Sequence, residues 1–393
     1  MRALARELER SGPAMVQTQV ADLAGDLAEK LCQKAGGRLC RAFFASSGSE
    51  GVEAAIKFAR AHTRRAGILS AEHGFHGLTC GALSLMSDSF WKEGFGPLLA
   101  DAKAVPFGEL ESLARELKTK RYAAFVVEPI QSEAGVCVPP ADYLRTAESL
   151  CRRYGTLFVL DEVQTGMHRT GPFLAAHHFQ VEPDMVVLAK ALRGGLVPSG
   201  AVLMSKAVGD SVYSSLPRAF VHTSTFSENS LAMRSGLATL EVLQGENLGS
   251  RALDAGGYLC QRLREVFGDY EMVKEVRGAG LLLGIEFCAP QQLRLRIPYQ
   301  ALRAMHGGIS GQIVVMRLFR DFGFLTPNLR EQFHGAESGS AAGGQRPATR
   351  CLCGSGSPGG EAGAFAGCIL GRGAGLGAAR LSRMKKHQFA CNF

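Results

Sequence analysis

Residues 159–195 read VLDEVQTGMHRTGPFLAAHHFQVEPDMVVLAKALRGG, and this stretch decides the fold. Two short apolar runs, Leu157–Leu160 and Met185–Ala189, each end next to a charged residue, which is Asp161 after the first run and Lys190 after the second. Unbroken apolar runs of this length are typical of strands in a parallel sheet that is covered on both faces. Ligands of such sheets bind at the carboxyl ends of the strands. We therefore expect a ligand site near the two charged residues.

Asp161 and Lys190 are the two residue types that pyridoxal phosphate chemistry requires. In enzymes that use this cofactor, a lysine forms a Schiff base and an aspartate pairs with the pyridinium nitrogen. Because each charged residue follows its own strand, both are expected at the same edge of the sheet. The pattern predicts a pyridoxal phosphate site, which the remaining motifs test.

Upstream, the run Arg41–Ala45 turns into a helix through the sequence SSGSEGVEAAIKFARAH at 46–62. Ser47, followed three residues later by Glu50, fits a capping box at the start of a helix. A glycine turn at a helix N-terminus, here at Gly48, exposes backbone N–H groups and the positive end of the helix dipole, which suits a phosphate. An ordinary helix cap explains the same pattern, so both interpretations stay open.

The sequence EHGFHG at 72–77 follows another short apolar run, and its glycines predict a loop that exposes Phe75 and His76 at a strand end. The ring of Phe75 would be able to stack on a pyridine ring there, although plain core packing is an equal alternative. A further buried-strand pattern, Ala123–Pro129, contains Glu128 near its end, and a structural role is expected for this carboxylate.

Strand and helix patterns alternate from residue 41 onwards, which predicts an α/β fold with a mostly parallel sheet flanked by helices and right-handed connections. A long helix from about residue 229 to 243 leads into a second, smaller α+β domain. The tail is rich in Gly, Ala and Arg and lacks periodicity, so we expect it to be disordered. The expected limits are 1–40 for an N-terminal helical segment, 41–245 for the large domain, 246–333 for a partial small domain and 334–393 for the tail.

The composition, with 46% apolar and 20% charged residues in 393, is that of an ordinary soluble globular protein. Seven Lys or Arg against two Glu lie in 334–393, so five of the eight net positive charges belong to the tail, and nucleic-acid binding has no support elsewhere. Eleven cysteines without metal-site or framework spacing indicate reduced thiols. No apolar run reaches the roughly 18 residues of a membrane span. We expect a cytoplasmic protein with no metal, nucleic-acid or membrane partner.

Six motifs in a fixed order resemble the class III pyridoxal phosphate-dependent aminotransferases, which include the ornithine, acetylornithine and 4-aminobutyrate aminotransferases. The motifs are SSGSEGVEAAIKFAR, HGFHG, VVEPIQSEAGV, LFVLDEVQTGMHRTG, PDMVVLAKALRGGLVPSGAVL and HTSTF. The resemblance covers about residues 5–333. It implies fold type I of the pyridoxal phosphate-dependent transferases, with the large domain carrying the cofactor, and a homodimer.

The resemblance implies roles for the residues around the reactive part of the cofactor. Lys190 would be the Schiff-base lysine and would also carry the proton between substrate carbon and cofactor. Asp161 would keep the pyridinium nitrogen protonated, so that the ring acts as an electron sink. Gln164 would contact the phenolic oxygen of the cofactor.

The resemblance also implies how the cofactor and the substrate are held. Gly48 and Ser49 match the amides that cradle the phosphate, and Phe75 matches the stacking ring. Thr225 matches a threonine that reaches the phosphate of the neighbouring subunit's cofactor. Glu133 corresponds to a glutamate of the ornithine and 4-aminobutyrate branch, which pairs with a C-terminal arginine and gates between amine and dicarboxylate substrates.

The implied reaction is transamination of a primary amine or ω-amino acid with an oxo-acid acceptor. The sequence departs from the family pattern in three places: SENS follows STF where the family has GGNP, and both the N-terminal segment and the C-terminal arginine lack a match. We therefore expect a chain truncated at both ends. Two alternatives stay open, a non-catalytic relative that binds the cofactor at most, and an aminomutase or racemase on the same scaffold.

Overall fold

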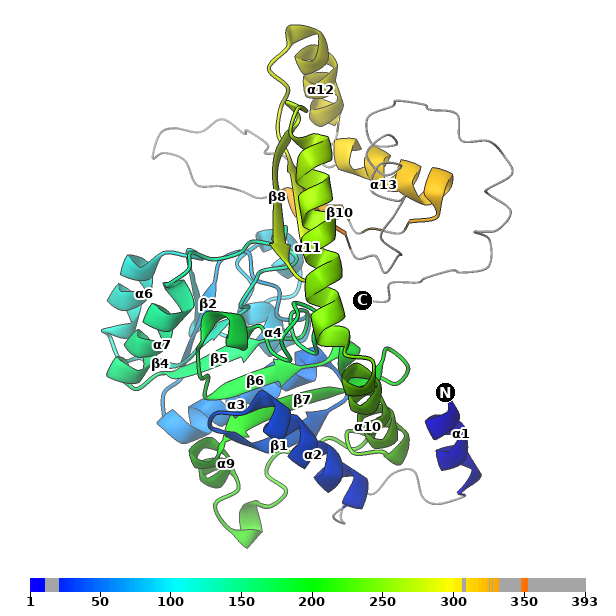
Figure 1. The fold of residues 1–393 in the computed structure, drawn as a ribbon. Helices are drawn as coiled ribbons and strands as arrows, with labels where there is room; N and C mark the ends of the chain where they lie inside the picture. The colour runs from blue at the N-terminus through cyan, green and yellow to red at the C-terminus, as the bar shows by residue number, and fades with distance from the viewer. Residues whose placement is uncertain (11–20, 306–308, 325, 327, 332–347, 353–393) are drawn as a thin grey trace. The chain divides into compact units, whose positions relative to one another are not determined.

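The computed structural model describes residues 1–10, 21–305, 309–324, 326, 328–331 and 348–352 (Figure 1). The chain divides into two compact units. The first unit comprises Met1–Gln131 and Pro139–Arg251, and the second comprises Ser132–Val138 together with the chain from Ala252 onwards. The short segment Ser132–Val138 thus belongs with residues far away in the sequence. The domain limits expected from the sequence are four uninterrupted ranges of the chain, and they stay predictions.

The first unit contains a seven-stranded sheet with the strand order β1-β7-β6-β5-β4-β2-β3 (Figure 1). The strands from β6 to β3 run parallel, and β7 is antiparallel to both of its neighbours. This confirms the predicted mostly parallel α/β sheet. The strands are β1 (Leu39–Ala45), β2 (Gly67–Ala71), β3 (Ala102–Val105), β4 (Tyr122–Val127), β5 (Leu157–Asp161), β6 (Met185–Leu188) and β7 (Gly200–Ser205).

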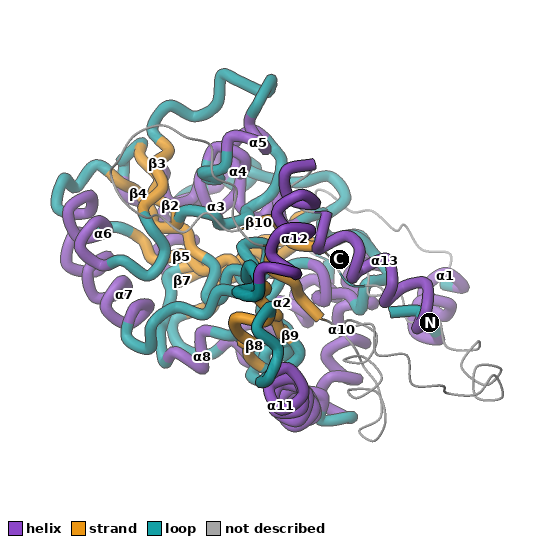
Figure 2. Tube along the Cα trace, turned by 90° about the horizontal axis from the view of Figure 1, so that it is seen from above, coloured by secondary structure: helices purple, strands orange, loops and turns teal. Residues whose placement is uncertain are grey.

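Helices cover both faces of this sheet, which is why every residue of β4, β5 and β6 is buried (Figure 2). One face packs on a core that includes α2 (Asp22–Ala35), α6 (Leu110–Leu117), α7 (Tyr143–Tyr154), α8 (Ala176–Phe179) and α10 (Ser230–Gly245). The other face packs on α3 (Gly48–Thr63), α4 (Cys80–Ser84) and α9 (Lys206–Val212). The remaining elements of the unit are α1 (Arg2–Glu9), α5 (Ser89–Lys92) and the 3-10 helices η1 (Lys190–Arg193) and η2 (Leu216–Arg218).

Local signals define the helix ends. The α7 helix stops at Gly155, whose φ of 64° lies in the left-handed region that glycine adopts easily. The α10 helix begins after Asn229, whose side chain accepts a hydrogen bond from the amide of Ala232. The start of α10 lies within a residue or two of the position that the sequence predicts, about residue 229.

The second unit contains a four-stranded antiparallel sheet with the order β10-β11-β9-β8. Its small core includes Leu263, Phe267, Val276, Ile285 and Leu318. The elements are α11 (Leu248–Phe267), whose first residues belong to the first unit, β8 (Val273–Ala279), β9 (Leu282–Phe287), α12 (Leu293–Met305), α13 (Ile309–Phe322), β10 (Asn328–Glu331) and β11 (Ala348–Leu352). Among the described residues, no helix combines the length and apolarity that crossing a membrane requires.

Strand β11 lies within residues 334–393, where the sequence pattern predicts disorder. For residues 348–352 this prediction is wrong, because Thr349 to Leu352 pair with Glu286 to Leu283 of β9. Backbone hydrogen bonds to β9 hold residues 349–352 in a strand, although their composition carries no strand signal. The rest of the predicted disordered tail lies outside the described residues.

Candidate active site

Six of the seven strands of the large sheet point the same way, so their carboxyl ends lie at one edge. Strand β1 is antiparallel to β7, which is itself antiparallel to β6, so β1 points the same way as β2, β4, β5 and β6. The turn before α3, the loop 72–77, Glu128 and Lys190 each follow the carboxyl end of one of these strands, and Asp161 is the last residue of β5. The motifs singled out in the sequence therefore converge where parallel sheets bind their ligands.

The first turn of α3 is capped as predicted. The amide of Glu50 donates to Ser47 Oγ at 3.1 Å, and Glu50 Oε2 accepts from the amide of Ser46 at 2.8 Å, one residue further back than in the usual capping box. The amides of Gly48 and Ser49 lie in this turn, where an α-helix offers them no carbonyl four residues back. They also lie at the positive end of the helix dipole, so the turn favours an anion.

Gly48 brings this turn close to both charged residues of the site. A Cβ atom on Gly48 would lie 3.0 Å from Val163 Cγ2 and 3.4 Å from Ala189 Cβ. Val163 is two residues beyond Asp161, and Ala189 directly precedes Lys190. A Cβ at this position would be tight against the side chain of Val163, which would have to give by a few tenths of an ångström, whereas glycine permits the contact.

The Asp161 carboxylate is buried and oriented by two donors. His76 Nδ1 lies 2.8 Å from Asp161 Oδ2, and because a carboxylate only accepts, the imidazole N–H donates. The amide of Val163 donates to Asp161 Oδ1 at 3.1 Å. His76 and Asp161 are each only 3% exposed, so the prediction that His76 is exposed is wrong. The pairing spans 85 positions in the chain, and no local pattern announces it.

The loop that carries Phe75 is held from two sides. Glu128 Oε2 accepts a hydrogen bond from the amide of Phe75 at 3.0 Å. On the other side, Gly77, with φ +117°, lies so close to α3 that a Cβ there would be 2.2 Å from Ser49 Oγ. The Phe75 ring is half-buried and meets Trp91 edge to face, with ring centroids 5.4 Å apart. The carboxylate of Glu128 thus orients the backbone of this loop.

Lys190 is the first residue of η1 and has a φ of +41°. Non-glycine residues rarely adopt positive φ, and such strain concentrates at functional sites. Gln164 lies three residues beyond Asp161 and is half-buried, as Lys190 is. The η1 helix ends at Gly194, whose φ of +62° lies in the left-handed region.

Two buried ionisable groups adjoin these residues in the chain. Burial raises the pKa of Glu162 to about 7, against hydrogen bonds to the carboxylate from the amides of Ala176 and Ala175 and from the Thr165 hydroxyl. Burial also lowers the pKa of Arg193 to about 9, and its guanidinium lies 5.5 Å from the centre of the Phe44 ring. Glu162 thus links the end of β5 to the start of α8.

Two further candidate residues are carried by other segments of the chain. Thr225 is exposed in the loop before α10, and its neighbour Ser224 donates from Oγ to Glu50 Oε2 at 3.3 Å, so the loop lies beside the first turn of α3. Glu133 belongs to the second unit, within the segment Ser132–Val138.

The groups at this edge fit pyridoxal phosphate. Helix N-terminal amides suit its phosphate, the buried Asp161 carboxylate suits a protonated ring nitrogen, the Phe75 ring offers a stacking face and the Lys190 amine suits its aldehyde. Gly48 allows the backbone itself to approach the phosphate. Among the described residues, no cluster of three or more His, Cys, Asp or Glu side chains suits a metal ion.

Residues 2–322 match the family described as aminotransferase class-III. Aminotransferase PigE of Serratia sp. (strain ATCC 39006) is 41% identical over 286 residues, which are 72% of this chain and 34% of that protein. The chain therefore spans about a third of the length of this curated relative.

Solved structures are similar over most of the chain. The ornithine aminotransferase of Toxoplasma gondii, crystallised in the presence of oxidised glutathione, is 29% identical with a TM-score of 0.76, over 94% of this chain and 80% of that one. An amine transaminase from an uncultivated Pseudomonas species, in its pyridoxal phosphate-bound form, is 26% identical with a TM-score of 0.77, over 94% of this chain and 85% of that one. The chain belongs to the class-III aminotransferases, and its cofactor is the pyridoxal phosphate of that family.

Proposed function

We propose that the chain catalyses transamination of a primary amine or ω-amino acid with an oxo-acid acceptor. The observation that carries this proposal is the convergence of Asp161 and Lys190 at the ends of the neighbouring strands β5 and β6, with the first turn of α3 packed against both. A carboxylate, an amine and a helix N-terminus in one place are the parts that this reaction needs.

Pyridoxal phosphate, when bound, supplies an aldehyde that condenses with amines and a ring that accepts electrons from the substrate. Asp161 keeps the ring nitrogen protonated, because its carboxylate is buried and pinned by His76 and by the amide of Val163. Lys190 takes the proton from the substrate carbon and returns it, as a general base and acid. The positive φ of Lys190 is an outlier of the kind that concentrates at functional sites, which supports this role.

The remaining candidate residues hold and orient. The amides of Gly48 and Ser49 bind the phosphate, Phe75 stacks on the ring and Gln164 contacts the phenolic oxygen. Each contact restricts the reacting bond to one geometry, which is where much of the rate gain of such enzymes arises. Glu133 takes part in recognising the donor substrate.

We propose that the active form is at least a homodimer in which Thr225 reaches the phosphate of the neighbouring subunit's cofactor. Large apolar side chains are exposed along the same loop region, namely Leu216, Phe220 and Phe226. Three exposed large apolar side chains within eleven residues are consistent with an association surface. A cytoplasmic location is proposed because the described cysteines are thiols.

The test is to load the purified protein with pyridoxal phosphate, reduce it with borohydride and locate the modified peptide by mass spectrometry. The cofactor should be attached at Lys190, and a mixture of amine donor and oxo acid should yield the new amino acid. Lys190→Ala should lose the attachment and reduce turnover by roughly 10²–10⁴-fold, because it removes the proton-transferring group. Lys206→Ala, at an exposed lysine of α9, is the matched control and should change neither.

Two outcomes would contradict the proposal. Wild-type protein without covalent cofactor and without product would favour the non-catalytic alternative. Product formed from the amine alone, with no oxo acid present, would favour the aminomutase or racemase.

A further inference from the structure

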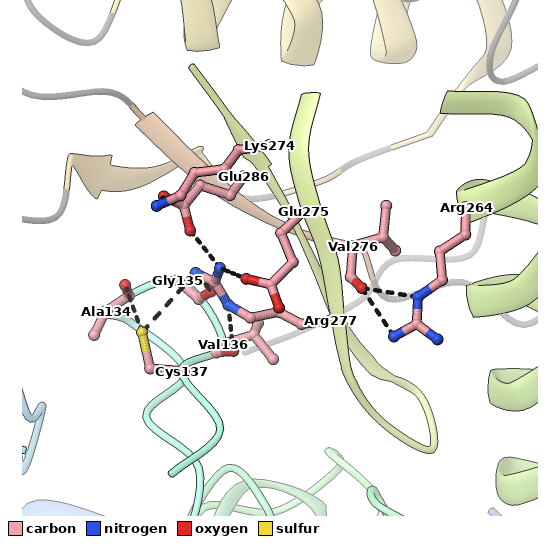
Figure 3. Close-up of polar contacts among 10 residues, drawn as sticks. All are labelled: Ala134, Gly135, Val136, Cys137, Arg264, Lys274, Glu275, Val276, Arg277 and Glu286. Carbon is pink, nitrogen blue, oxygen red and sulfur yellow. Dashed lines mark hydrogen bonds and ion pairs between the residues drawn. The ribbon is translucent and has the colours of Figure 1, made fainter. Parts of the chain in front are cut away.

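Arg277 of β8 contacts a turn of the chain that is far away in the sequence (Figure 3). Its Nε donates to the carbonyl of Val136 at 3.0 Å, and its Nη2 donates to the carbonyl of Gly135 at 3.0 Å. Cys137 Sγ lies 4.0 Å from the same Nη2. All of these residues belong to the second unit. One guanidinium thus binds two consecutive carbonyls of the segment that contains Glu133.

The turn is tight and strained. The amides of Gly135 and Val136 both donate to the carbonyl of Ser132, at 3.0 and 3.1 Å, so the residues from 132 to 136 close on themselves. Val136 is fully buried and has a φ of +56°, which is an outlier for a β-branched residue. Such a conformation persists only when its surroundings hold it. The two hydrogen bonds from Arg277 are contacts that do so.

Arg277 is itself held by carboxylates on the same sheet. Its Nη1 donates to Glu275 Oε2 at 2.8 Å and also to Glu286 Oε2. Lys274 Nζ donates to the other oxygen of Glu286 at 2.6 Å. The Arg277 side chain is 12% exposed and that of Glu286 only 4%. The guanidinium is therefore enclosed between carboxylates on one side and carbonyls on the other.

The charge on Glu286 is maintained. Burial alone would raise the pKa of its carboxyl group, but the hydrogen bonds from Lys274 and Arg277 outweigh burial and leave the pKa below its ordinary value. A guanidinium stays protonated in proteins. The ion pair between Arg277 and Glu286 is consequently present at neutral pH. The hydrogen bonds from Arg277 to the turn therefore do not depend on a change in the protonation of either side chain.

We propose that Arg277 is a positioning residue: by binding the carbonyls of Gly135 and Val136 it fixes the 132–136 turn, and thereby the direction in which Glu133 meets the donor substrate. Glu133 lies inside the hydrogen-bonded turn, two residues before Gly135, so its backbone cannot move independently of the clamped carbonyls. The inference rests on the proposed role of Glu133 in donor recognition. Arg277 touches neither substrate nor cofactor in this role.

The first test is amide hydrogen exchange, read by mass spectrometry on the cofactor-loaded protein. Arg277→Lys keeps the charge but cannot bind two carbonyls and two carboxylates at once. Exchange in peptides covering 132–138 should accelerate at least about tenfold, because two hydrogen bonds to buried carbonyls are lost. Arg277→Met should behave likewise, and if it fails to fold, Arg277→Lys carries the test.

The chain offers a matched control in Arg264 of α11, which binds a carbonyl of the same strand. Arg264 also donates twice to a backbone carbonyl, from Nε at 3.1 Å and from Nη2 at 3.0 Å to Val276, but it does not contact the turn (Figure 3). Arg264→Met should leave exchange at 132–138 unchanged. Glu275→Gln, at a carboxylate that is 51% exposed, should change it by less than about twofold, because Glu286 still holds the guanidinium.

The second test is kinetic. Arg277→Lys should raise the KM for the amine donor about tenfold while kcat and the cofactor dissociation constant stay within about twofold, since the turn serves binding rather than proton transfer. Glu133→Gln should raise the same KM, and Arg264→Met should not.

Each result decides. Faster exchange together with a raised donor KM supports the inference. Unchanged exchange in Arg277→Lys overturns it, whatever the kinetics. If Glu133→Gln raises the donor KM but Arg277→Lys does not, the role of Glu133 stands and that of Arg277 falls. If exchange accelerates but neither variant alters the donor KM, the proposed role of Glu133 fails, and the inference fails with it.

Discussion

Replacing Gly77 by alanine should weaken cofactor binding, although Gly77 is not itself a candidate cofactor contact. Gly77 lies against the first turn of α3, and its φ of +117° is a conformation that residues with a side chain avoid. An alanine Cβ would lie 2.2 Å from Ser49 Oγ, 2.8 Å from Ser49 Cβ and 3.0 Å from Ser49 Cα. The last of these atoms is backbone, so rotating the serine side chain does not relieve the clash.

The size of the effect follows from these distances. Relaxed contacts between carbon atoms begin at about 3.5 Å, so the first turn of α3 must shift by roughly 0.5–1 Å. Such a shift spoils at least one hydrogen bond from an amide to the phosphate, which is worth about 1.5–3 kcal/mol when one partner is charged. The dissociation constant for pyridoxal phosphate should rise by about 10- to 150-fold. The strained φ should also cost about 1–3 kcal/mol of folding free energy.

The assay is an equilibrium titration of apoprotein with pyridoxal phosphate, with circular dichroism and urea unfolding as checks of the fold. Gly25→Ala is the control, because it introduces the same methyl group inside α2, where no atom lies within 4 Å of the new Cβ. It should leave cofactor affinity unchanged and add about 0.5–1 kcal/mol of stability. Adding Ser49→Ala to the Gly77→Ala protein removes the shortest contact and should recover part of the affinity. A folded Gly77→Ala protein that binds the cofactor as tightly as wild type would refute the reasoning.

Two further predictions concern buried groups at the strand ends. His76→Phe removes the donor to the buried Asp161 carboxylate and should lower the free energy of unfolding, measured in urea titrations, by about 1–3 kcal/mol. His76→Asn, whose amide can occupy the place of Nδ1, should lose less than half of that free energy. Equal losses in the two variants would argue against the hydrogen bond as the cause. Burial raises the pKa of Glu162 from 4.5 to about 7, so its contribution to stability is present below pH 4.5 and is lost as pH rises through about 7. Wild type should therefore lose about 3 kcal/mol from this group across that interval, and Glu162→Gln should show a flatter dependence of unfolding free energy on pH. Parallel pH profiles for the two proteins would exclude Glu162 as the source.

Part of the candidate site could be predicted because its signals are local. The apolar runs before Asp161 and Lys190 are buried strands, since strands covered on both faces are typically near-continuous apolar runs. The cap at Ser47 depends on residues three positions apart. The order of the six motifs then identified the family, and residues 2–322 match it. The roles of the individual residues stay predictions that the variants above would test.

Other features depend on contacts between distant parts of the chain. His76 carries no pattern that predicts its burial against Asp161, and the prediction of an exposed side chain fails for that reason. The composition around β11 predicts no strand, yet β9 supplies the partner that orders it.

The amino-acid sequence by itself determined that the runs before Asp161 and Lys190 are buried strands, that a helix begins at the Ser47 cap, and that a carboxylate and an amine stand at the ends of the two strands β5 and β6. Only the tertiary structure decided that Ser49 meets Gly77, that His76 orients Asp161 and that Arg277 of β8 binds the turn beside Glu133. The physical reason is the range of the interactions. Capping and hydrophobic periodicity act over a few residues, whereas the contact between Arg277 and Val136 spans 141 positions and exists only once the chain has folded.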